Sequence, residues 1–171
     1  PIDRAYSQYN MLINWRKSQL LHEYELFSDK EQLNILLKKL LDTQNFPFSY
    51  WVNQEIEKIR NQENTPIDFF PDFLHRGFYY EQLERYYQFF PVENILVIEH
   101  RELKNNRIST LRKIEQFLNI SYVDWNTINL DDKFVSQYNV KLPSDIRNKL
   151  KAFFKPYNEK FYKLIKRNFD W

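Results

Sequence analysis

The sequence predicts a domain of the α/β class in which helices dominate. Several stretches place apolar residues three and four residues apart, as in amphipathic helices. One short run, Ile95-Leu96-Val97-Ile98, is apolar without alternation, which fits a strand buried on both faces of a parallel sheet. A lone strand leaves its backbone groups unpaired, so either its neighbours lie outside this chain or the domain is all-helical. We favour neighbours outside the chain.

Length and composition fit one globular domain. The 171 residues are enough to bury a core, and a composition of 43% hydrophobic and 28% charged residues is typical of a folded protein. The single glycine, Gly77, excludes Gly-rich phosphate loops within these residues. The absence of cysteine excludes disulfides and thiol nucleophiles. A net charge of +2 does not indicate a nucleic-acid partner, and no apolar run predicts a transmembrane segment.

The first part of the chain predicts three helices. Residues 3–16 begin with an aspartate that suits the positive end of a helix dipole, and they carry an apolar stripe. Residues 28–41 open on a Ser-x-x-Glu capping box and continue as a leucine-rich helix. Pro47 breaks the chain, and residues 49–59 form a third helix with a serine as its cap.

The middle of the chain predicts a loop, a helix and the strand. Residues 61–73 contain two prolines and read as a loop. Gly77 then precedes a fourth helix over 78–89, and the buried strand lies within 94–100.

The last part predicts three more helices. A fifth helix covers 107–118, and residues 119–142 are irregular. Ser144 caps a sixth helix, and Pro156 begins a seventh that ends at Arg167.

Several polar groups have ordinary structural explanations. His22, His75 and His100 lack the spacing of metal ligands, and the pair Asp131-Asp132 lacks a second carboxylate cluster, so no metal site is predicted. Adjacent aromatic pairs are not interleaved with a basic stripe, which favours core packing over stacking on bases. The lysine-rich carboxyl end is best read as the solvated face of amphipathic helices.

The opening segment carries a more specific signal. Residues 1–9, PIDRAYSQY, resemble the helix start of sulfotransferases that use 3′-phosphoadenosine 5′-phosphosulfate (PAPS), in the heparan-sulfate-type and bacterial branch. The family pattern is Arg-Asn-Pro-x-Asp/Glu-Arg-Ala-Tyr-Ser-x-Tyr, and the match here begins at the proline. A hydroxyl in the first two helical turns can donate to a phosphate. The resemblance implies that Ser7 binds the donor 3′-phosphate, and that Arg4 either braces the site or forms a surface ion pair.

The resemblance continues in order along the chain. The segment around Gly77 is similar to the family pattern Arg-x-Gly-x-Tyr-x-x-x-Leu-x-x-Trp/Tyr, where a glycine would allow a positive φ or a close approach. Later blocks resemble the family's strand with its Glu-Asp-Leu element, its next helix, and its closing helix and tail. These blocks are 95–103, 110–118, 155–162 and 169–171.

Two further residues acquire roles from the resemblance. His100 follows the strand where the family usually has an aromatic residue near adenine, so it is a candidate to stack on the base. Lys133 is the best candidate from the basic loop that covers the 3′-phosphate, although the family's glycines are absent there. The family's 5′-phosphosulfate loop and its usual catalytic Glu or His would precede Pro1, so no catalytic residue is assigned.

These observations together predict the carboxy-terminal portion of a single sulfotransferase domain over residues 1–171, with the amino-terminal part missing. The implied fold is a P-loop-kinase-like α/β fold with a short parallel sheet. The implied reaction moves a sulfuryl group from PAPS to a hydroxyl or amine of a glycan, lipid, polyketide or small-molecule acceptor, without a metal. The alternative is a non-catalytic helical protein-interaction module. The lack of cysteine and of a leader predicts a cytoplasmic location.

Overall fold

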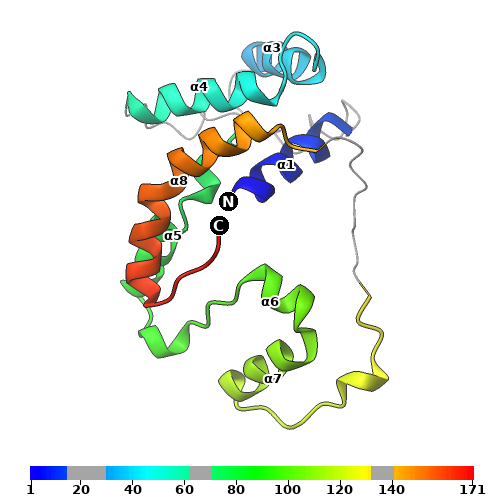
Figure 1. The fold of residues 1–171 in the computed structure, drawn as a ribbon, viewed down its shortest axis with the longest axis vertical. Coiled ribbons are helices and arrows are strands. Elements are labelled where there is room, and N and C mark those ends of the chain that lie inside the picture. Colours follow the sequence, from blue (N-terminus) through cyan, green and yellow to red (C-terminus); the bar gives the residue numbers. More distant parts are fainter. Residues whose placement is uncertain (15–29, 62–70, 132–140) are drawn as a thin grey trace.

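A computed structural model describes residues 1–14, 30–61, 71–131 and 141–171 of the chain (Figure 1). The α-helices in these ranges are α1 (Ile2–Asn14), α3 (Lys30–Leu41), α4 (Phe48–Arg60), α5 (Tyr79–Tyr87), α6 (His100–Asn105), α7 (Arg107–Leu118) and α8 (Ser144–Ile165). Short 3₁₀ turns are η1 (His75–Gly77), η2 (Val92–Asn94) and η3 (Trp125–Thr127). None of the helices in these ranges is both long enough and apolar enough to cross a membrane.

The predicted P-loop-kinase-like α/β fold with a parallel sheet is wrong for the described ranges, which contain helices and no strand. The run Ile95-Leu96-Val97-Ile98 is extended, with Ile95 at φ −125° and ψ 111°. A strand is defined by hydrogen bonds to a neighbouring backbone, and no described segment supplies one. An apolar run therefore identified an extended segment here, but not a sheet.

Most predicted helices are confirmed. α4, α5 and α7 begin and end within two residues of their predicted ranges, and α1 begins one residue earlier than predicted. The proposed capping serine of α3, Ser28, lies outside the described residues. The sequence did not predict α6, which opens on a reciprocal capping box between Glu99 and Glu102.

The carboxyl-terminal helix α8 is one helix where the sequence predicted two. Pro156 lies in its interior, and the helix changes direction along its length (Figure 1). An interior proline costs about 3 kcal/mol or more, because it removes one hydrogen bond and crowds the preceding turn. Burial on both sides of the proline offsets that cost, since Leu150, Phe154 and Phe161 are all buried.

The core forms around α1. Ala5, Tyr9 and Leu12 of this helix are buried, and α1 contacts α3, α8 and η1. The Tyr9 ring lies 5.1 Å from Phe48 and 5.8 Å from Phe73, between centroids. Further core members are Ile2 of α1, Leu142 just before α8, and buried apolar residues of α3, α4, the η1 region and α8: Leu33, Leu37, Leu40, Trp51, Val52, Ile56, Leu74, Phe78, Leu150 and Phe154.

Gly77 lies where η1 passes close to α8. A Cβ atom at this position would lie 2.8 Å from Cε1 of Phe154, too close for an ordinary contact. The backbone of Gly77 is not in the left-handed region. Of the two reasons that the sequence allowed for this glycine, close approach is therefore the correct one.

The helices α6 and α7 form a second group with the segment that follows them (Figure 1). Glu115 of α7 is 6% exposed and accepts hydrogen bonds from the Val123 N–H and the Trp125 indole, both at 2.9 Å. Arg112 pairs with the same carboxylate at 2.7 Å. Residues 119–131, predicted to be irregular, contain only η3 and are held to α7 by this carboxylate.

Candidate functional site

The amino end of α1, the extended run after η2, the start of α6 and the carboxyl-terminal tail line one cavity of about 1290 Å³. This volume is sufficient for a nucleotide-sized ligand. Both polar and apolar side chains line the cavity. The polar residues of the lining include Asp3, Arg4, Ser7, Glu99, His100, Arg101, Arg147, Lys151 and Asp170. The apolar and aromatic residues include Tyr79, Leu83, Tyr86, Phe90, Ile95, Leu96, Phe161, Phe169 and Trp171.

Ser7 lies on the second turn of α1 and is half-buried at the cavity wall. The helix directs Ala5, Tyr9 and Leu12 into the core, whereas Ser7 lies on the face toward the cavity. Amphipathic periodicity therefore turns Ser7 toward the cavity. Its position in the first two turns places the hydroxyl near the positive end of the α1 dipole. A hydroxyl in this position suits an anionic group.

Arg4 lies one turn earlier on α1 and also lines the cavity. Its Nη1 donates to Oε1 of Gln8 at 2.7 Å, and its Nη2 donates to the backbone carbonyl of Phe73. Its Nε is buried and has no hydrogen-bond partner among the described residues. Burial lowers the pKa of Arg4 from its usual value. The guanidinium thus braces the chain near Phe73 from its place at the cavity wall.

His100 is the first residue of α6 and lies exposed on the same cavity. The sequence placed it at the end of a strand, and the structure places it at the start of a helix. The fold therefore brings His100 to the same cavity as Ser7 and Arg4, although it lies more than 90 residues further along the chain. The fourth predicted site residue, Lys133, lies outside the described residues.

Three further basic residues on the cavity wall were not predicted as site residues. Arg147 and Lys151 are four residues apart on α8, which places them on the same helical face. Arg147 pairs with Asp3 of α1 at 2.8 Å, and Arg101 donates to the carbonyl of Asp170 at 2.9 Å. The four-residue spacing of Arg147 and Lys151 was visible in the sequence. The sequence did not show which lysines and arginines of α8 line a cavity and which face solvent.

The carboxyl-terminal tail closes one side of the cavity with stacked aromatic rings. The Trp171 ring is stacked on Phe161 at 5.7 Å and lies 5.5 Å from Tyr79, between centroids. Phe169 also stacks on Trp171, at 4.9 Å between centroids, and lies 6.2 Å from Phe161. The Trp171 indole also donates to Oε1 of Glu99 at 2.9 Å, next to His100.

The wall combines basic side chains with three carboxylates, those of Asp3, Glu99 and Asp170, and with aromatic rings. Basic side chains and a helical hydroxyl can bind phosphate or sulfate groups, and aromatic rings can contact a planar base. Within the described ranges, no group of three or more His, Cys, Asp or Glu side chains could hold a metal ion. The geometry therefore fits a ligand with anionic groups and an aromatic ring.

Comparison with known proteins found two similar sulfotransferases. The chain is 33% identical over 98 residues to "Membrane-associated sulfotransferase kil1" of Dictyostelium discoideum, covering 57% of this chain and 20% of that protein. It is 25% identical over 112 residues to "Heparan sulfate glucosamine 3-O-sulfotransferase 5" of Homo sapiens, covering 54% of this chain and 32% of that protein.

The chain therefore spans less than a third of the length of these curated relatives. No family model matches the chain, and no solved structure matches it significantly. The two similarities support a relationship to sulfotransferases in general.

Proposed function

We propose that this chain is part of a sulfotransferase and that its cavity contributes to binding the donor PAPS. The observation that carries the proposal is the meeting of Ser7, Arg4 and His100 at one cavity. A family resemblance in the sequence singled out these residues, and two sulfotransferases are similar to the chain. PAPS carries a 3′-phosphate, a 5′-phosphosulfate and an adenine, which match the anionic and aromatic requirements of the wall.

Each residue has a distinct role in this proposal. The Ser7 hydroxyl donates to the 3′-phosphate near the amino end of α1, and the guanidinium of Arg4 at the same cavity adds positive charge beside it. His100 contacts adenine from the start of α6. Lys133, from a segment outside the described residues, adds positive charge over the 3′-phosphate.

The proposed reaction is an in-line transfer of the sulfuryl group from PAPS to a hydroxyl or amine acceptor. The sulfur–oxygen bond to the donor phosphate breaks, a bond to the acceptor forms, and the acceptor gives up its proton. Such transfers depend mainly on positioning and on stabilisation of developing negative charge. The residues described here hold the donor, and none of them is assigned as the base that takes the proton.

Binding of adenosine 3′,5′-bisphosphate, the product after transfer, tests the proposal by calorimetry on the full chain. We expect saturable binding, and we expect Ser7→Ala to weaken it by about 1–3 kcal/mol through loss of a charge-assisted hydrogen bond. Ser144→Ala is the matched control, because Ser144 opens α8 and does not line the cavity.

An unchanged dissociation constant in Ser7→Ala would remove Ser7 from the site. The absence of any binding by the unaltered chain would instead favour the helical interaction module.

A further inference from the structure

Glu55 is a buried carboxylate on α4 that does not line the cavity. Glu55 is only 1% exposed, and its two carboxyl oxygens accept hydrogen bonds from backbone N–H groups of the η1 region. The N–H of Phe73 donates to Oε1 at 2.7 Å, and the N–H of Leu74 donates to Oε2 at 2.6 Å. One carboxylate thus satisfies two buried backbone donors that precede the η1 turn.

The opposite edge of the same segment is bound by α1. The carbonyl of Phe73 accepts a hydrogen bond from Nη2 of Arg4, and the carbonyl of Pro71 accepts one from Nε2 of Gln8 at 3.0 Å. Residues 71–74 are therefore held by side chains on both edges, from α4 on one side and from α1 on the other. The peptide group between Phe73 and Leu74 is common to both sets of contacts, because its N–H donates to Glu55 and its carbonyl accepts from Arg4.

The backbone conformation of residues 71–74 explains why these contacts are needed. Asp72 has a φ of 58°, which is uncommon for a residue other than glycine. Its Oδ1 is buried without a hydrogen-bond partner among the described residues, although His75 Nδ1 lies 3.8 Å away. A strained conformation persists only where the surroundings impose it. The contacts from Glu55, Arg4 and Gln8 impose it here.

We propose that Glu55 is a positioning residue that orients Arg4 at the cavity through the backbone of residues 71–74. Oε2 of Glu55 holds the N–H of the peptide group between Phe73 and Leu74, and the carbonyl of that same peptide group holds Nη2 of Arg4. With Nη1 bound to Gln8, the guanidinium is then kept in one orientation at the cavity that Arg4 lines. The ligand part of this inference rests on the proposed function, whereas the structural coupling does not.

A double-mutant cycle in the full chain tests the coupling without any ligand. Glu55→Gln retains one acceptor oxygen and turns an amide NH₂ toward the second backbone N–H. We expect its effect on the unfolding equilibrium constant to differ by about tenfold between the unaltered chain and an Arg4→Gln background. If the effects of the two substitutions on the unfolding equilibrium constant multiply to within about twofold, the two residues are not coupled and the inference is wrong.

Hydrogen exchange provides a measurement that does not require Glu55→Gln to fold. Arg4→Gln should accelerate exchange of the Phe73 and Leu74 amides by about tenfold relative to amides in the middle of α7. The two amides are bonded to Glu55 and not to Arg4, so acceleration reports transmission through the segment. Exchange unchanged relative to α7 would contradict the inference.

Binding of adenosine 3′,5′-bisphosphate separates positioning from general stability. We expect Glu55→Gln to weaken binding by about tenfold, because a displaced Arg4 no longer aims its donor. Leu37→Val is the control, since Leu37 is fully buried on α3 and its truncation destabilises the core while every hydrogen bond to residues 71–74 described above is kept.

Equal affinity in Glu55→Gln and the unaltered chain would overturn the positioning role and leave the proposed function intact. If the unaltered chain does not bind the probe, the proposed function fails, and the cycle still decides the coupling.

Discussion

The carboxyl group of Glu55 titrates far from its usual range. Burial raises its pKa to about 8, and nearby Asp72 adds to the rise. The backbone donors of Phe73 and Leu74 and the charge of Arg4 act in the opposite direction without cancelling the effect of burial. The folded chain therefore binds a proton at Glu55 more tightly than the unfolded chain, in which this carboxyl has its ordinary pKa near 4.5.

Stability should consequently fall as pH rises between about 5 and 8. The contribution of Glu55 is fully present below its unfolded pKa and is lost as the pH rises through its folded pKa, with a slope of about 1.4 kcal/mol per pH unit at most. Urea denaturation between pH 5 and 9 measures this slope. Glu55→Gln should remove it, because the amide does not titrate.

The control for that series is Glu57→Gln on the same helix. Glu57 is exposed and pairs with Arg60 at 3.0 Å, so its loss should leave the slope in place. A slope that survives in Glu55→Gln would assign the pH dependence to other groups.

Individual residues show how much of this site could be predicted from the sequence. Ser7 and Arg4 were found because they fall in one short motif at a helix start, and His100 because it follows a distinctive apolar run. Glu55 gave no such signal, because its partners are backbone N–H groups that only the tertiary fold brings to it. Lys151 was likewise read as a solvated cation, since the sequence does not show which part of α8 lines the cavity.

At the scale of the element, two helices end in left-handed residues that are not glycine. Asn119 follows α7 at φ 51°, and Lys166 follows α8 at φ 53°. In both caps the next N–H donates back into the last turn: Ile120 to the carbonyl of Glu115, and Arg167 to that of Tyr162, each at 3.2 Å. These bonds satisfy terminal carbonyls that would otherwise lack partners.

The two caps should respond differently to glycine. Lys166→Gly relieves a left-handed conformation that lysine tolerates poorly, so we expect stability to rise by up to about 1 kcal/mol. Asn119→Gly should change stability less, because asparagine adopts this conformation readily. Thermal denaturation of the two variants compares them directly. A larger gain at Asn119 than at Lys166 would contradict this account of the caps.

Helices were more predictable than the segments between them. Apolar spacing and caps are local, so the ranges of α4, α5 and α7 followed from the sequence. The run 95–98 did not become a strand, because strand formation depends on a neighbour that no local pattern supplies. The prediction that a new helix begins at Pro156 was wrong because tertiary burial outweighed a local signal. Burial of Phe154 and Phe161 keeps α8 continuous despite the proline.

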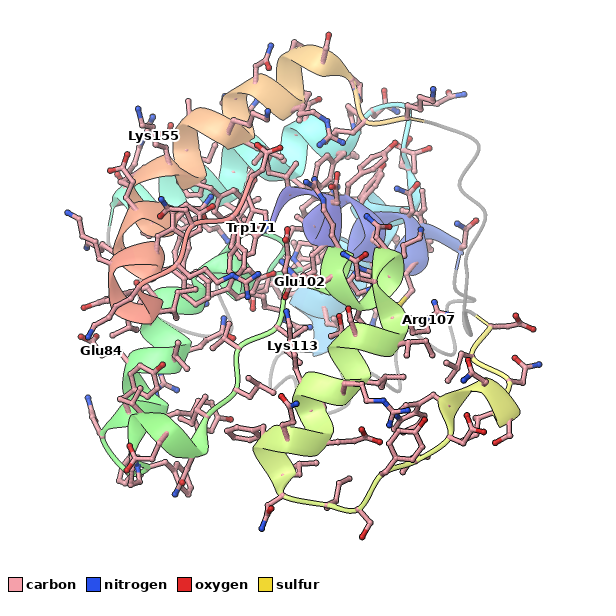
Figure 2. The ribbon with its side chains drawn as sticks, turned by 60° about the horizontal axis from the view of Figure 1, so that its bottom comes forward. Glu84, Glu102, Arg107, Lys113, Lys155 and Trp171 are labelled. Atoms are coloured by element: carbon pink, nitrogen blue, oxygen red, sulfur yellow. The ribbon has the colours of Figure 1, made fainter. Side chains whose placement is uncertain are left out.

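At the scale of the whole molecule, the tail connects the two groups of helices. Trp171 donates to Glu99, Arg101 donates to the carbonyl of Asp170, and Arg167 pairs with Glu102. Figure 2 shows Trp171 and Glu102 near the middle of the molecule, where the tail meets α6. These contacts join the α6–α7 group to α5 and α8.

Loss of the Trp171 side chain should loosen that junction. We expect Trp171→Ala to destabilise the chain by about 2–3 kcal/mol and to accelerate amide exchange in α6 more than in α3. Trp171→Phe separates the two contributions, because it keeps an aromatic ring against Phe161 and removes the indole donor to Glu99. Equal exchange changes in α6 and α3 would contradict a role for the tail at this junction.

The central position of α1 limits how the cavity can change during evolution or design. Its first two turns supply both Ser7 at the ligand side and Ala5 at the most crowded part of the interior. A substitution in these two turns that alters ligand preference would also disturb the core, so we expect few substitutions to be tolerated there. Lys151 is exposed and also lines the cavity, so we expect substitutions there to change ligand selectivity with less effect on the core.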